Sequence, residues 1–150
     1  MVYLHERFVN IELPKPAEPN ISRIGDSLLV THQAEIFAGV TRWIQSRTKK
    51  EDYIYAFPHE PHYYFLAGRR CPDIFTNSLD AGISKGFQER AVERISKENV
   101  KYAILVKDSF CVMGNAQVPN KERIPVIYKY FEENFFPVIS FDGTVILERK

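Results

Sequence analysis

The sequence has little of several features that define large classes of proteins. It contains two cysteines, Cys71 and Cys111, and no CxxC pair or Cys/His cluster with the spacing of a zinc site. Its apolar runs, such as 103–106, are far shorter than the ~20 residues of a membrane-spanning helix. A formal net charge of +1 gives no broad basic surface for nucleic acid, so no nucleic-acid partner is expected.

Motifs that bind cofactors or activate nucleophiles are absent as well. Neither a GxGxxG nor a GxxxxGK[ST] pattern occurs, and Gly82, Gly86 and Gly114 are isolated, which argues against a Rossmann or P-loop protein. Ser109 lacks the flanking glycines of a nucleophile elbow, and Cys111 has no evident histidine partner. We therefore expect no cofactor and no covalent catalysis.

What is present fits one folded domain. The 150 residues are 45% hydrophobic and 26% charged, which is typical of a globular protein with a single core. Residues 1–24 contain Pro14, Pro16 and Pro19, a density that favours an extended arm or an edge strand over a helix. Residues 25–150 are predicted to form a single α/β domain.

Apolar periodicity predicts three amphipathic helices, at about 31–50, 84–98 and 123–134. Nearly all-apolar runs at 53–57 and 102–106 predict strands that are buried on both faces. The Asp142-Gly143 dipeptide between apolar runs predicts a closing hairpin. We therefore expect a three-layer sandwich of a mostly parallel mixed sheet flanked by helices, with a C-terminal β-hairpin at its edge. Its central strands are expected to hold the apolar residues Ile54, Phe57, Ile104 and Val106.

The segment 53–75 is the most informative part of the chain. Pro58 is expected to end its strand, because proline cannot donate to a sheet ladder. Pro61 suits the first turn of a short helix, and Gly68 is a natural left-handed stop for it. A basic pair, Arg69 and Arg70, follows this stop.

Ligands of α/β sheets bind beyond the carboxyl ends of the strands, here around residues 57–60 and 107–110. The chain leads directly from the first of these ends into the short helix. We therefore predict a substrate-binding rim, without catalytic residues, formed by His59, Glu60, Tyr63, Arg69 and Arg70. In it the guanidinium groups suit phosphate, and Tyr63 is expected to offer an exposed ring.

Each of these features has a structural alternative. The arginines can cap the helix C-terminus and pair with Asp73 or Glu60. The aromatic triplet 63–65 can split, with two rings in the core and one exposed. His59 and His62 with a carboxylate resemble metal ligands, but Pro61 restricts their geometry, so no metal site is expected.

The segment also resembles the C-terminal soluble domain of GT-C-type, family 39-like membrane glycosyltransferases, which are related to dolichyl-phosphate-mannose–protein mannosyltransferases. The shared pattern is an apolar strand, a proline, a polar residue, Tyr-Phe-Leu, Gly-Arg-Arg, a proline and an aromatic. The resemblance covers roughly residues 25–150, and further similar stretches lie at 41–45, 92–95, 100–106 and 130–135.

The resemblance implies a non-catalytic, extracytoplasmic domain of a polyprenyl-phosphate-sugar-dependent glycosyltransferase that assists donor or acceptor binding. Its expected partners are the membrane-embedded part of the same enzyme and a lipid-phosphate sugar or an acceptor glycan or protein. In that family the catalytic acids lie in a loop between the first membrane helices, so none is expected here. Two alternatives remain: a stand-alone cytoplasmic small-ligand-binding or regulatory domain, and a small hydrolase using His59, Glu60 and Asp108.

Overall fold

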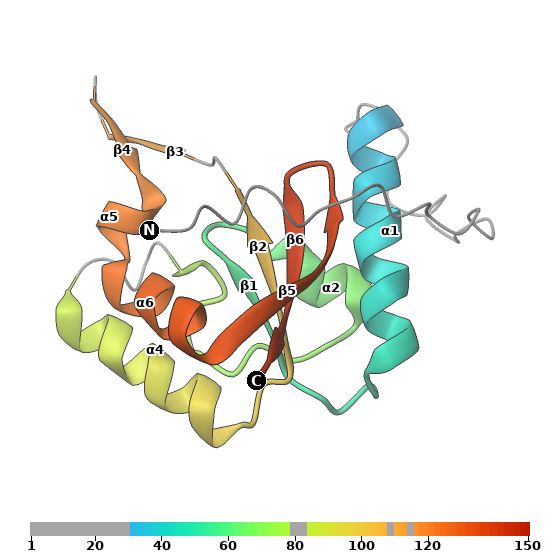
Figure 1. Cartoon of the computed structure of the whole chain (residues 1–150), viewed down its shortest axis with the longest axis horizontal. Helices are drawn as coiled ribbons and strands as arrows, with labels where there is room; N and C mark the ends of the chain where they lie inside the picture. The colour runs from blue at the N-terminus through green and yellow to red at the C-terminus, as the bar shows by residue number, and fades with distance from the viewer. Residues whose placement is uncertain (1–30, 79–83, 108–109, 114–115) are drawn as a thin grey trace.

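The computed structural model describes residues 31–78, 84–107, 110–113 and 116–150 (Figure 1). The predicted arm at 1–24 and the strand-end residues Asp108 and Ser109 lie outside these ranges. Among the described residues, no helix is both long and apolar enough to cross a membrane.

A four-stranded mixed sheet forms the centre of the molecule. Its strand order is β1 (Ile54–Phe57), β2 (Tyr102–Val106), β6 (Thr144–Arg149) and β5 (Phe135–Phe141). The α/β class, the mixed sheet and the C-terminal strand pair are confirmed. Only β1 and β2 are parallel, whereas β2–β6 and β5–β6 are antiparallel, so the predicted mostly parallel pairing is wrong. The reason is that the closing hairpin joins the sheet with β6 directly beside β2, and this leaves β5 as the predicted antiparallel edge.

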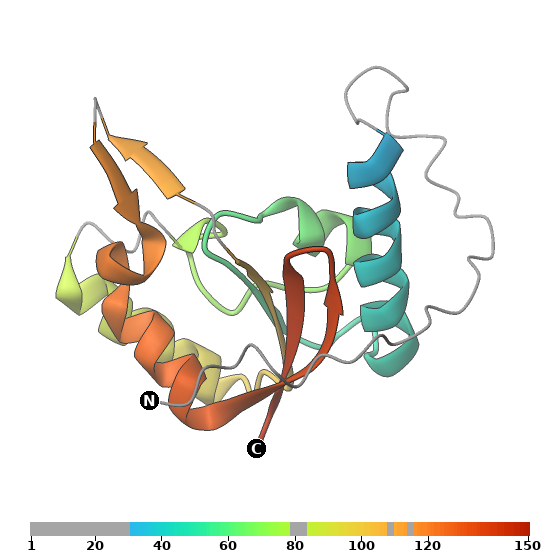
Figure 2. The same cartoon turned by 45° about the horizontal axis from the view of Figure 1, so that its top comes forward.

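Helices cover both faces of this sheet. The helices α1 (Thr31–Arg47) and α2 (His62–Ala67) lie on one face, and α4 (Lys85–Lys97) and α6 (Pro125–Asn134) lie on the other (Figures 1 and 2). Alternate residues of β1 serve the two faces: Ile54 belongs to the core under α1 and α2, and Phe57 to the core under α4 and α6. The predicted three-layer arrangement is confirmed.

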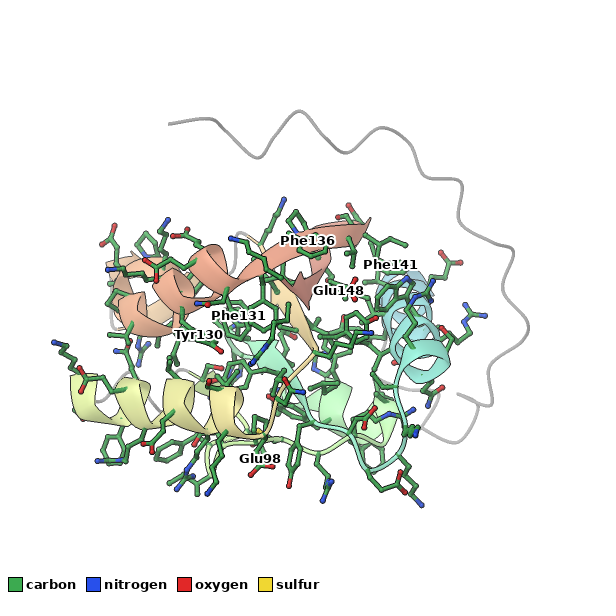
Figure 3. The ribbon with its side chains drawn as sticks, turned by 60° about the horizontal axis from the view of Figure 1, so that its bottom comes forward. Glu98, Tyr130, Phe131, Phe136, Phe141 and Glu148 are labelled. Carbon is green, nitrogen blue, oxygen red and sulfur yellow. The ribbon has the colours of Figure 1, made fainter. Side chains whose placement is uncertain are left out.

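The core under α4 and α6 is rich in stacked aromatic rings. Phe131 lies between α6 and the sheet (Figure 3), with its ring centroid 4.5 Å from that of Phe57 and 5.5 Å from that of Tyr55. Such offset pairs add to the stabilisation from burial. This packing fixes α6 against β1 and therefore fixes the end of β1 from which the candidate site begins.

Burial agrees with prediction for three of the four residues named for the central strands. Ile54, Phe57 and Ile104 are buried, whereas Val106, at the end of β2, is half-buried. The strand β1 is at the edge of the sheet rather than in its centre. Chain beyond α2 protects this edge, because the backbone N–H of Ile54 donates to the carbonyl of Arg70 at 3.1 Å.

Local sequence signals account for the element boundaries. Ser84 caps α4 by accepting a hydrogen bond from the backbone N–H of Phe87 at 3.3 Å. Pro125 occupies the first turn of α6, where its missing N–H costs nothing. Gly68 ends α2 with φ at +61°, and Gly143 takes φ of +83° in the hairpin turn. The helix stop predicted at Gly68 and the turn predicted at Asp142-Gly143 are confirmed, while the cap at Ser84 is a further finding.

One pair of strands was missed by the sequence analysis. The strands β3 (Phe110–Met113) and β4 (Ala116–Pro119) form a separate antiparallel ladder, followed by the short helix α5 (Asn120–Arg123). This pair extends from the body of the domain (Figure 2). The signal was in the sequence, since Gly114-Asn115 stands between the apolar run 110–113 and the mostly apolar run 116–119.

Candidate functional site

The five predicted site residues lie on one short stretch of chain, residues 59–70, which we call the β1–α2 rim. It begins where β1 ends at Phe57, and it contains the whole of α2. The helix spans only ~9 Å and runs back along β1, so His59 and Glu60 follow the end of β1 whereas Arg70 pairs with Tyr53 at its start. The structure thus spreads the five residues along α2 and gives them different environments.

His59 and Glu60 stand at the start of the rim. His59 is exposed, whereas the Glu60 side chain keeps only 16% of its surface accessible. The Oε2 atom of Glu60 is 3.5 Å from Nε2 of His62. Burial raises the pKa of Glu60 to about 7, an effect that the nearby His59 opposes. Glu60 is therefore poised to change its protonation near neutral pH.

Tyr63 does not offer an exposed ring, so that prediction is wrong. Its side chain is fully buried in the core under α1 and α2, and its ring meets that of Phe37 edge-on with centroids 5.6 Å apart. Burial raises the pKa of the Tyr63 hydroxyl. Tyr63 faces inward because it lies on the face of α2 that packs into the core, together with Tyr64 and Ala67.

The aromatic triplet splits as its structural alternative predicted. Tyr64 is also buried, and its hydroxyl accepts a hydrogen bond from the backbone N–H of Ala56 at 2.9 Å. Phe65 points outward and is 79% exposed. The ring that the rim offers to solvent therefore belongs to Phe65, which the sequence analysis had not singled out within the triplet.

Arg69 is a capping residue for two helices. Its Nε donates to the hydroxyl of Thr48 and its Nη2 to the carbonyl of Thr48, each at 2.8 Å. Its Nη1 donates to the carbonyl of Ala67, also at 2.8 Å. Since a cation stabilises the negative end of a helix, Arg69 joins the C-terminal ends of α1 and α2. The capping alternative is confirmed for this residue.

Arg70 is more accessible than Arg69. Its Nε and Nη2 donate to the carbonyl of Glu51, with the Nε bond at 2.8 Å. Its guanidinium carbon lies 4.2 Å from the ring centroid of Tyr53, a cation–π distance. The Arg70 side chain is exposed, and its hydrogen bonds use only Nε and Nη2 of the guanidinium. Arg70 is therefore better placed than Arg69 to bind an anion.

The salt bridge predicted from the arginine pair to Asp73 or Glu60 is wrong. Asp73 pairs with Arg94 of α4, whose Nη1 lies 3.3 Å from Oδ1. This ion pair joins the chain after α2 to α4, and burial raises the pKa of Asp73 although Arg94 opposes that effect. Cys71 carries a free thiol, while the side chain of Cys111 lies outside the described part of the structure.

A surface groove between α4 and α6 was not predicted. Its volume is about 460 Å³. Two ion pairs of the same i,i+4 type border it, with Lys85 to Glu89 at 3.4 Å and Lys129 to Glu133 at 3.8 Å. The repeated Lys-x-x-x-Glu spacing on two helices was the available signal. The remaining lining residues are Val92, Pro125, Val126 and Tyr130.

The described residues contain no group of three His, Cys, Asp or Glu side chains arranged to hold a metal ion. What the β1–α2 rim does offer is a histidine, a carboxyl group, an exposed phenylalanine and an exposed arginine. Such a set suits contact with a ligand that is partly anionic and partly apolar.

No protein-family model and no curated protein sequence matches this chain. Among solved structures, a similar one is the C-terminal globular domain of an oligosaccharyltransferase from Archaeoglobus fulgidus. It is 16% identical in sequence, and the match covers 81% of this chain and 99% of that chain with a TM-score of 0.46. A similarity at this TM-score does not by itself establish a common fold. The class that the structure defines is an α/β three-layer domain with a polar and aromatic rim beyond β1.

Proposed function

We propose that the chain is the extracytoplasmic, non-catalytic domain of a membrane glycosyltransferase that uses a polyprenyl-phosphate sugar. The membrane-embedded part of the same enzyme is its partner, and the β1–α2 rim contacts the lipid-phosphate donor or the acceptor. Support comes from the segment 53–75, which carries the resemblance to family 39-like enzymes.

The observation that carries the proposal is that this segment combines buried side chains with two exposed ones. Its apolar strand and two tyrosines are buried, whereas Phe65, at 79% exposure, and the exposed Arg70 face solvent. Neither of these two exposed side chains contributes to the packing of the core. A polyprenyl phosphate combines an apolar chain with an anionic group, and an exposed ring and an exposed guanidinium on the same rim suit these two parts.

The five predicted residues then take two kinds of role. His59, Glu60 and Arg70 are proposed as contact residues, together with Phe65. Tyr63 and Arg69 are positioning residues, because the first is buried and the second holds the ends of α1 and α2.

The proposal is tested in the membrane enzyme that contains this domain. The variants Arg70→Gln and Phe65→Ser are compared with Lys97→Gln, an exposed position on α4 on the other face of the sheet. We expect transfer from the polyprenyl-phosphate sugar to fall at least tenfold in the two rim variants, with the melting transition unchanged. Transfer equal to that of the Lys97→Gln control would refute a contact role.

The groove between α4 and α6 favours the stand-alone ligand-binding alternative. At about 460 Å³ it falls in the range of small-molecule sites. An NMR titration of the chain separates the two functions, since a ligand of the groove perturbs Val92 and Tyr130 and leaves the rim unchanged.

A further inference from the structure

Glu60 and His62 form a close pair of ionisable groups at the start of α2. They flank Pro61, and Oε2 of Glu60 lies 3.5 Å from Nε2 of His62. Their side chains keep 16% and 34% of their surface accessible, respectively. The Nε2 atom of His62 is buried without a well-formed hydrogen bond, so this nitrogen is an available acceptor facing a carboxyl oxygen.

The surroundings of the pair are largely uncharged. The imidazole of His62 lies against the ring of Phe37 from α1 at 4.4 Å and against that of Tyr63 at 4.3 Å, measured between ring centroids. Tyr63 in turn interacts with Thr144 of β6. Among the described residues, the outside ionisable group that acts on both members of the pair is His59, on the same turn. A charge on either member is therefore poorly solvated and poorly compensated.

We propose that Glu60 and His62 hold one proton in the folded domain, that it resides on the carboxyl oxygen of Glu60, and that its loss places a negative charge on the β1–α2 rim. In the protonated state the O–H of Glu60 donates to the neutral Nε2 of His62, whose own proton is on Nδ1. When the proton leaves to solvent, a carboxylate faces a neutral imidazole.

The electrostatics of the site agree with this arrangement. Burial raises the pKa of Glu60 from 4.5 to about 7, and burial lowers the pKa of His62 below 6.5. In the unfolded chain the order is reversed, because histidine binds the proton more tightly than glutamate there. Folding therefore moves the proton from His62 to Glu60.

The sign of the pH dependence follows by linkage. Glu60 alone contributes stability that is present below pH 4.5 and lost as the pH rises through about 7. His62 alone contributes stability that is present above pH 6.5 and lost as the pH falls. Between pH 4.5 and 6.5 the folded and unfolded chains each bind one proton at the pair. The two opposite dependences of stability on pH therefore offset each other.

The consequence is a rim whose charge changes near neutral pH while the fold does not. Below about pH 7 the pair is neutral, and above it the pair carries one negative charge beside His59. This inference does not depend on the proposed function, since it concerns protonation alone. If the rim does bind a phosphate, that binding weakens as the pH rises past this point.

The protonation states are measured by NMR on the whole chain, from the side-chain carboxyl carbon of Glu60 and the ring nitrogens of His62. At pH 5.5 we expect a protonated carboxyl and a neutral imidazole, with Lys97→Gln, an exposed position on α4, as a control that leaves both states in place. A carboxylate together with an imidazolium at pH 5.5 would overturn the proposal.

Urea unfolding of three variants gives an independent readout. Relative to the double variant Glu60→Gln/His62→Gln, we expect the folding equilibrium constant of Glu60→Gln to rise from pH 5 to 7. That of His62→Gln is expected to fall by well over tenfold from pH 5 to 8, since each pKa unit corresponds to a factor of ten and the pKa of Glu60 moves from 4.5 to about 7. Parallel pH profiles for all three variants would contradict a shared proton.

Discussion

At the residue scale, Arg69 supports the candidate site by joining the ends of α1 and α2. Its guanidinium reaches the last carbonyls of two helices, with bonds of 2.8 Å to both Thr48 and Ala67. Arg70, the next residue, bonds to the carbonyl of Glu51 and stacks on Tyr53. Two adjacent arginines thus have different tasks, and they can be separated by mutation.

We expect Arg69→Gln to lower the free energy of unfolding by about 2 kcal/mol, because several buried or half-buried carbonyls lose a charged donor. Arg70→Gln is the matched control and is expected to cost under about 1 kcal/mol, since its contacts are exposed. Urea unfolding of both variants measures the difference. Equal losses would contradict the assignment of Arg69 as the clamp between α1 and α2.

The hydroxyl of Tyr64 gives a second prediction at this scale. It accepts the backbone N–H of Ala56 within the core, at 2.9 Å. Tyr64→Phe leaves this buried donor without a partner, so we expect a loss of roughly 1–3 kcal/mol. Tyr53→Phe is the control, because it keeps the ring beneath Arg70. A Tyr64→Phe variant as stable as the wild type would show that the hydroxyl does not hold α2 to β1.

At the scale of elements, the close approach of α1 to the sheet depends on Gly39. A Cβ atom added at this position would lie 2.9 Å from the ring of Phe141 in β5, and Phe141 lies beside α1 (Figure 3). The helix α1 also forms one wall of the core under the β1–α2 rim. A small residue at position 39 therefore sets where the rim lies relative to the sheet.

We expect Gly39→Ala to destabilise the domain by about 1–3 kcal/mol, because the ring or the helix must shift. Gly86→Ala in α4 is the control, since its added Cβ would lie 3.9 Å from Oγ of Ser84. That substitution is expected to stabilise by roughly 0.5–1 kcal/mol through helix propensity. Thermal unfolding of both variants decides the matter, and a shift of the same sign in both would contradict the account of α1 packing.

Much of this element-level structure could be predicted from the sequence, because it follows from local chemistry. Ser84, Gly68 and Asp142-Gly143 define a cap, a helix end and a turn with few alternatives. Strand pairing could not be predicted in the same way, since nothing local to β6 indicates that it pairs with β2 as well as β5. The direction of Tyr63 also depended on tertiary packing, because the triplet 63–65 is apolar on every side.

At the scale of the whole molecule, the two candidate ligand surfaces are separate. The β1–α2 rim lies on the α1 and α2 side of the sheet, and the groove lies between α4 and α6 on the other side (Figure 1). The proposed function places the ligand at the rim, whereas the stand-alone alternative places it in the groove. The sheet between them makes the two surfaces distinguishable in one experiment.

The most direct test is an NMR titration of the isotopically labelled chain with farnesyl phosphate, a short polyprenyl phosphate, with farnesol and inorganic phosphate as controls. The account predicts amide shifts for farnesyl phosphate at His59, Phe65 and Arg70, larger than with either control, and loss of these shifts in Arg70→Gln. Shifts confined to Val92 and Tyr130 would assign the ligand site to the groove. An unchanged spectrum at the rim with farnesyl phosphate would contradict the claim that this domain contacts the lipid-phosphate donor.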